Sequence, residues 1–195
     1  MDPSLFVALI AGIGIAAAAG LRAFLPLFAM GIAHRFGIIG LHAKFEWLSS
    51  DVALVALGAA TLIEVLADKV PVVDHFLDMA ATFLRPIAAA LAAYAFLINW
   101  PTPWGQIVAL MLGAGALAMH AAKSQVRLGS TVTTAGAANP ILSFVEDGVA
   151  MALIIAVILA PFAALLVMLF LVGWLLRRRK RGAARRTEAP AQSTS

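Results

Sequence analysis

The stretch "LFVALIAGIGIAAAAGLRAFLPLFAMGIA", residues 5–33, decides the class of this protein. Arg22 is its single charged residue, and the run is longer than the ~20 apolar residues that a bilayer-spanning helix needs. Its apolar residues are continuous rather than alternating, which favours a membrane helix over a strand of a membrane barrel. Gly20 loosens the backbone and Pro26 removes a helix hydrogen bond. We therefore expect a first membrane helix that is kinked or broken at residues 20–26.

The rest of the chain has the same apolar character. Its 195 residues are 63% hydrophobic and 12% charged, and the mean hydropathy is +0.97. Further apolar segments follow at about residues 52–67, 79–100, 104–122, 141–160 and 161–176. The sequence predicts an all-α polytopic membrane protein, a bundle of about six transmembrane helices within one domain, residues 1–176.

The boundary at Pro161 leaves an alternative open. The motif "ILAPFA" contains no polar turn residue, so residues 141–176 could form one kinked helix and the protein would have five spans. Six spans place both termini in the cytoplasm, with Arg35 and Lys44 outside, and this agrees with the positive-inside rule. The basic groups that then lie on the cytoplasmic side are Lys69, Arg85, Lys123, Arg127 and the C-terminal tail.

The net positive charge belongs to that tail. Residues 177–195 hold seven Arg or Lys and one Glu (+6), whereas residues 1–176 hold seven Arg or Lys and nine Asp or Glu (−2). We expect a disordered cytoplasmic tail that contacts anionic lipid. Nucleic-acid binding is not expected because no binding module accompanies the basic run. The absence of cysteine removes disulfides, thiolate metal sites and cysteine nucleophiles.

Most of the acidic residues gather in "EVLADKVPVVDHFLD", residues 64–78. Glu64 and Asp68 are four residues apart and share a helix face. Pro71 is expected to end that helix near Val70. Residues 123–140, "KSQVRLGSTVTTAGAANP", are expected to form a polar connection.

The predicted topology brings the ionisable residues to one side of the bundle. The primary candidates for an ion or substrate pathway are Arg22, Glu64, Asp68, Lys123, Arg127, Glu146 and Asp147. The secondary candidates are Lys69, Asp74, Asp78, Arg85, His120 and Asn139. Ionisable groups inside a bilayer are costly, and they usually face a bundle interior or an aqueous cavity. Two interpretations remain: a polar vestibule for an ion, or an internal ion-pair network that only holds the helices together.

Signatures of enzymes are scarce. The chain has no GxSxG, HExxH or P-loop motif, and no cofactor is expected. Glu64 and Asp68 could hold a hard divalent cation through oxygen ligands, although acidic pairs at this spacing are common.

A weak internal similarity relates "AAAGLRAFLP" in the first segment to "TTAGAANPIL" before residue 143. With three helices in each half, a true repeat would be inverted, as in many transporters. Ala- and Gly-rich sequences also match by chance, so the repeat remains one interpretation.

Four motifs in order, "EVLADKVPVVDHFLD", "RPIAAAL", "HAAKSQVR" and "NPILSFVEDGVA", resemble a bacterial membrane family called domain of unknown function 4126. The resemblance covers about residues 5–176. It implies a multi-span protein of the bacterial inner membrane, with the charged residues as the family signature. It implies no substrate.

We therefore expect a small transporter or channel for protons, small ions or a small metabolite, more probable than an enzyme and in need of a homo-oligomer to complete a pathway. One alternative is a membrane-embedded, metal-dependent enzyme that acts on a lipid or polyprenyl phosphate. The other is a structural or regulatory membrane subunit.

Overall fold

The computed structural model describes residues 3–67, 71–134 and 137–160. All regular structure in these ranges is helical, which confirms the predicted all-α class. The elements are α1 (Pro3–Leu21), α2 (Leu25–Arg35), the 3-10 helix η1 (Ala43–Ser49), α3 (Asp51–Ala67), α4 (Pro71–Leu97), α5 (Trp104–Thr134) and a further helix, Asn139–Ala160.

The chain divides into two compact units, Met1–Ile158 and Leu159–Ser195. The first unit contains almost everything described below. The predicted segment 161–176 and the basic tail lie outside the described residues. The choice between five and six spans and the boundary at residue 176 therefore stay predictions.

Several of the described helices have the length and composition of membrane spans. Ser4–Leu21, Trp104–Thr134 and Asn139–Ala160 each qualify alone. The pair formed by η1 and α3, bent by 64°, would make a fourth span or a re-entrant loop. α4 contributes a shorter apolar stretch, Thr82–Leu97. The chain is thus a membrane protein by its helices, with three or four candidate spans among the described residues.

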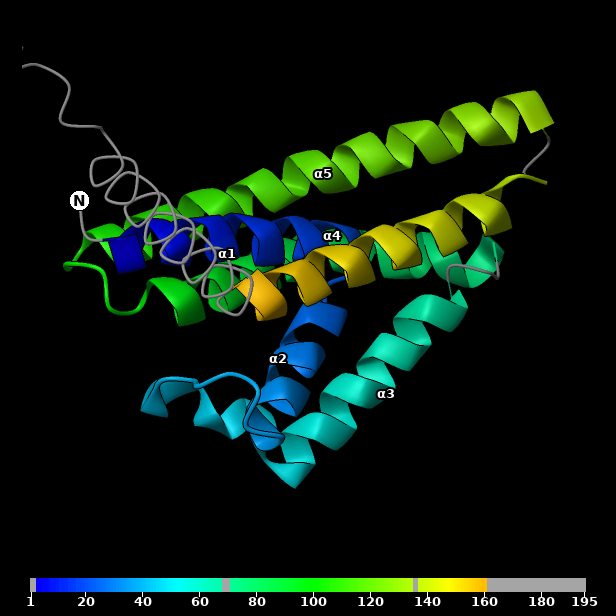
Figure 1. Cartoon of the computed structure of the whole chain (residues 1–195). Coiled ribbons are helices and arrows are strands. Elements are labelled where there is room, and N and C mark those ends of the chain that lie inside the picture. Colours follow the sequence, from blue (N-terminus) through cyan, green and yellow to red (C-terminus); the bar gives the residue numbers. More distant parts are fainter. Residues whose placement is uncertain (1–2, 68–70, 135–136, 161–195) are drawn as a thin grey trace, which may run out of the picture. The chain divides into compact units, whose positions relative to one another are not determined.

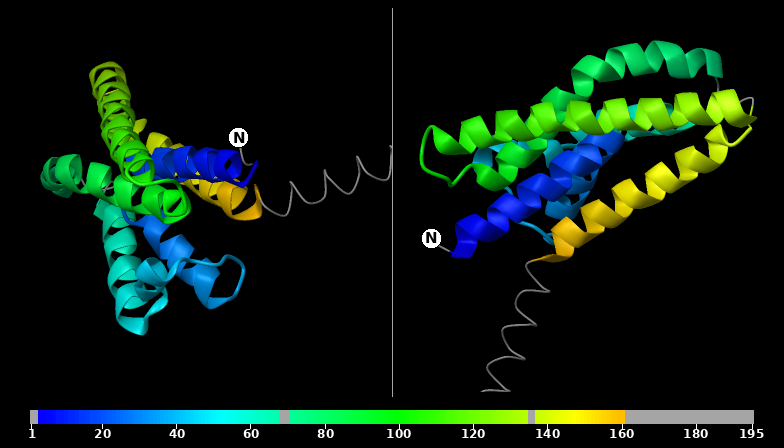
Figure 2. Two further views of the ribbon diagram at one scale, coloured as in Figure 1. Left: turned by 90° about the vertical axis from the view of Figure 1, so that its left-hand side faces the viewer. Right: turned by 90° about the horizontal axis from the view of Figure 1, so that it is seen from above.

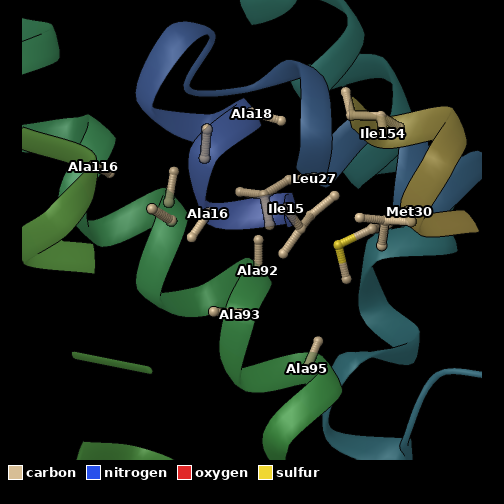
Figure 3. Packing of buried hydrophobic residues seen from close by; sticks show 14 of the residues in the cluster. Ile15, Ala16, Ala18, Leu27, Met30, Ala92, Ala93, Ala95, Ala116 and Ile154 are labelled. Atoms are coloured by element: carbon tan, nitrogen blue, oxygen red, sulfur yellow. The ribbon is translucent and has the colours of Figure 1, made fainter. Parts of the chain in front are cut away.

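Small side chains build the core of the bundle. α4 packs against both α1 and α5, and Figure 1 shows these helices running along one another. Ala92 of α4 is fully buried, as is Ile15 of α1, and Figure 3 shows Ile15 close to Ala92 and to Leu27 of α2. Alanine at such contacts lets helix backbones approach closely, which is how helices associate where the surrounding solvent is lipid.

α2, η1 and α3 form a hairpin that leaves this layer and returns to it (Figures 1 and 2). α2 packs on both η1 and α3. Gly31 makes the close approach of α2 to η1 feasible, because a Cβ atom there would lie 2.3 Å from the Leu48 carbonyl oxygen. Pro26 is the second residue of α2, where its missing N–H costs no helix bond.

The first span was predicted to run through a kink at residues 20–26. In the structure α1 ends at Leu21 and α2 begins at Leu25. The indole Nε1 of Trp100 donates to the carbonyl oxygen of Leu5 at 3.3 Å. The start of α1 therefore lies beside the turn that joins α4 to α5. One kinked span from residue 5 to residue 33 is not established.

Two boundaries differ from the sequence expectation. Pro71 begins α4 rather than ending the preceding helix at that point, since the first turn of a helix tolerates proline. α5 continues to Thr134, so the polar connection predicted at residues 123–140 is wrong for most of its length. The weak helix propensity of its Gly, Ser and Thr residues is overridden by buried charge contacts of Lys123 and Arg127.

Candidate functional site

A set of charged side chains is buried where α1, α3, α4, α5 and Asn139–Ala160 meet. The buried polar members are Arg22, Glu64, Arg85, His120, Lys123, Arg127 and Ser143. With Glu146 and Asp147, which contact them, these residues are called the buried charged cluster below. Arg127 lies 23 residues beyond the start of α5, about 35 Å along the helix. The cluster therefore occupies the end of the bundle remote from the Trp100 turn.

Glu64 of α3 caps a helix that is distant in sequence. Its carboxylate accepts the backbone N–H of Ala23 at 2.9 Å and that of Phe24 at 3.3 Å. Phe24 is the N-cap position of α2 and provides no side-chain cap of its own. A carboxylate is favoured there because the first N–H groups of a helix have no partner within it and the helix dipole attracts negative charge.

Arg22 connects the link between α1 and α2 to two other helices. Its guanidinium is fully buried. Nη2 donates to the Ser143 hydroxyl at 3.1 Å, and Nη1 donates to the Glu64 carbonyl oxygen at 3.4 Å. Nε lies 2.6 Å from Asp147 Oδ1, an ion pair without the alignment of a hydrogen bond. The single arginine of the first apolar stretch thus reaches α3 and Asn139–Ala160.

Arg85 of α4 lies between an acid and a histidine. Its Nη2 is 3.6 Å from Glu64 Oε1, just beyond hydrogen-bond distance, and its Nη1 contacts His120 Nδ1. Because a guanidinium can only donate, Nδ1 must act as the acceptor. The ring proton then belongs on Nε2, which faces the Thr82 hydroxyl at 3.4 Å.

Glu146 takes two cations from α5. Lys123 Nζ lies 2.9 Å from Glu146 Oε2. Arg127 approaches the same carboxylate with two nitrogens, Nε at 3.3 Å from Oε1 and Nη2 at 3.1 Å from Oε2. Such a two-nitrogen contact fixes orientation as well as charge. It holds the polar end of α5 against Asn139–Ala160.

One stripe of α5 serves both packing and charge. Its buried residues recur every three or four positions: Gly105, Ala109, Gly113, Ala116, His120, Lys123 and Arg127. This spacing keeps them on one face of a helix. The first half of the stripe is small and lets helices approach, and the second half carries the basic side chains of the cluster.

The comparisons with known proteins can be placed on this geometry. The family model described as "Domain of unknown function (DUF4126)" matches residues 9–181. The chain belongs to this family. Searches of curated proteins and of solved structures found no match. The range that matches DUF4126 contains the whole buried charged cluster, and the resemblance seen in the motifs is confirmed.

The structure of this DUF4126 chain brings together six of the primary candidates: Arg22, Glu64, Lys123, Arg127, Glu146 and Asp147. Arg85 and His120, predicted as secondary, lie inside the same cluster. Asn139 does not: its amide donates to Thr131 at 2.9 Å. Asp68 and Lys69 lie outside the described residues. Asp74 and Asp78 belong to α4, and their side chains are not described.

Two contacts were missed by sequence reasoning. Ser143 is four residues before Asp147, so the helical face that carries the acid also carries the hydroxyl. The spacing could have found it. Thr82 had no such signal, because its proximity to His120 depends on how α4 packs against α5.

A metal site was predicted weakly at Glu64 and Asp68. Among the residues that the structure describes, no group of three or more His, Cys, Asp or Glu side chains could hold a metal ion. Asp68 lies outside these residues, so the pair itself stays a prediction.

Proposed function

We propose that this protein is a small transporter or channel of the bacterial inner membrane that passes a small ion through the buried charged cluster. The observation that carries the proposal is the setting of Glu64. Its carboxylate is held mainly by main-chain N–H groups at the start of α2, while the nearest arginine nitrogen is 3.6 Å away.

This setting makes Glu64 the exchangeable acid of the cluster. The N-terminus of a helix binds anions in general, so another anion could take the place of the carboxylate. Protonation of the carboxylate would also release it from the start of α2. Glu146, in contrast, is fixed by Lys123 and by two nitrogens of Arg127.

The hairpin gives the cluster a backbone that can move. α2 has 11 residues, about 16 Å, which is too short to cross a hydrocarbon core of about 30 Å. Arg22 at its beginning and Glu64 near its end contact each other, so the hairpin starts and finishes at one depth. Interrupted helices within a membrane occur where they are buried in protein or line an aqueous cavity.

Flux measurements in liposomes test this function. Purified protein would be reconstituted and assayed against a panel of protons, monovalent cations and small anions. Glu64→Gln should abolish flux, because the amide keeps the shape but cannot carry the exchangeable charge. Asp51→Asn is the matched control, since Asp51 forms an exposed pair with Arg35 outside the cluster. It should leave flux unchanged.

No flux for any ion in the panel, or equal flux in Glu64→Gln and wild type, would contradict the proposal. A second candidate is a structural or regulatory subunit whose ion pairs only hold the helices together. The two-nitrogen contact between Arg127 and Glu146 favours it. That function predicts loss of thermal stability in Glu64→Gln together with an inactive wild type, whereas a folded, inactive Glu64→Gln supports transport.

A further inference from the structure

An apolar groove lies between α4 and α5, away from the buried charged cluster. Its volume is about 540 Å³, within the range of about 300–1,000 Å³ that is usual for ligand pockets. The residues that line it are Pro86, Ile87, Ala90, Leu91, Tyr94, Gln106, Ala109, Leu110, Gly113, Ala114 and Leu117. Both walls are apolar helix segments of membrane character.

The polar side chains of the lining gather at one end. Tyr94 of α4 and Gln106 of α5 both lie within one or two turns of the connection that contains Trp100. Trp104, which begins α5, is exposed. Tryptophan and tyrosine prefer the interface between membrane and water. This end of the groove therefore belongs at the membrane surface, and the rest belongs in the hydrocarbon.

The length of the groove matches one leaflet. Gln106 and Leu117 are the first and last lining residues on α5. The 11 steps between them correspond to about 16 Å of helix. Half of a hydrocarbon core of about 30 Å is about 15 Å. The opposite wall matches, because Pro86 and Tyr94 face the same stretch in the antiparallel direction.

We propose that this groove binds one acyl chain of a bilayer phospholipid, with its ester group at Tyr94 and Gln106 and its methyl end at Pro86 and Leu117. A lone apolar chain would need no polar groups at the surface end, and a helix of a second copy would not require a groove one leaflet deep. The phenol and the amide can donate to ester oxygens. The inference does not depend on transport.

Photo-crosslinking in phosphatidylcholine vesicles tests the proposal. One probe lipid carries a diazirine on the acyl chain near the glycerol, and a second carries it near the terminal methyl. Mass spectrometry then maps the labelled peptides. The first probe should label the surroundings of Tyr94 and Gln106, and the second should label the surroundings of Pro86 and Leu117.

Two variants fill the groove from opposite walls. Ala114→Leu and Leu91→Trp should each lose this position-dependent labelling. Gly115→Leu is the matched control, since a Cβ atom at Gly115 meets open space, and its labelling should equal that of wild type. Thermal unfolding in detergent confirms that each variant is folded.

Labelling that is the same for both probes, or that persists in both filled variants, overturns the proposal and indicates ordinary boundary lipid. Absence of lipid adducts in the groove, with protection that rises with the protein-to-lipid ratio, would instead assign the groove to a second copy and also overturn it.

Discussion

At the scale of single residues, the buried charged cluster consists of acids that each contact a cation. Glu146 is the most firmly held, with Lys123 and Arg127 on the same carboxylate. Removing one partner of a buried pair is costly because the other charge stays buried. Exposed pairs such as Arg35 and Asp51 contribute far less, since water screens them.

Glu146→Gln should therefore lower the unfolding free energy by about 3 kcal/mol, measured as the thermal midpoint in detergent. Asp51→Asn makes the same chemical change at an exposed pair and should cost below about 1 kcal/mol. Equal midpoints for the two variants would show that the buried pair contributes no more than the surface pair.

At the scale of elements, the hairpin of α2, η1 and α3 depends on a close backbone contact. A Cβ atom at Gly31 would lie 2.3 Å from the Leu48 carbonyl oxygen and 2.9 Å from Leu54 Cδ2. Backbone atoms cannot move aside cheaply, so the hairpin would have to open.

Gly31→Ala should destabilise the protein by about 1–3 kcal/mol, seen as a lower thermal midpoint. Gly115→Ala is the matched control, because its Cβ atom meets nothing within 4 Å. It should be neutral or stabilising by up to about 1 kcal/mol through helix propensity. A Gly31→Ala midpoint at or above that of Gly115→Ala would refute this account.

The cap of α2 is a second property of the hairpin. Glu64→Ala removes the acceptor of the Ala23 and Phe24 N–H groups, and losing a cap costs about 1 kcal/mol. Hydrogen exchange should become severalfold faster in the first turn of α2, with α5 between Trp104 and Met119 unchanged as the internal control. Exchange that rises evenly along the chain would indicate global destabilisation instead.

At the scale of the whole molecule, the contact of Trp100 with Leu5 constrains topology. The start of α1 lies with the turn between α4 and α5, and the cluster lies at the other end. Under the topology expected from the sequence, the N-terminus and the cluster are both cytoplasmic. The two placements conflict if α1 crosses the membrane alone.

Single cysteines can decide the matter, because the natural chain has none. Ser4→Cys and Thr102→Cys should react with a membrane-impermeant maleimide from one side, and Thr133→Cys from the other. The side on which Thr133→Cys reacts also tests the expected cytoplasmic location of the cluster. Reaction of Ser4→Cys on the side of Thr133→Cys would instead support a single kinked span over residues 5–33.

The sequence by itself determined the membrane character, the all-α class, the family and most members of the cluster. Apolar run length and charge spacing are local properties, so reading along the chain suffices for them. The same spacing indicated that Lys123 and Arg127 share a face, although not that their segment is helical.

Only the tertiary structure decided which charges meet. Glu64 caps α2 from 41 residues away along the chain, and Arg22 reaches Ser143 across 121 residues. Such partners are chosen by how helices pack, and packing depends on shape contacts such as Gly31 against Leu48 rather than on local pattern. The sequence supplied the charges, and the packing of the helices set which of them are paired firmly and which can exchange.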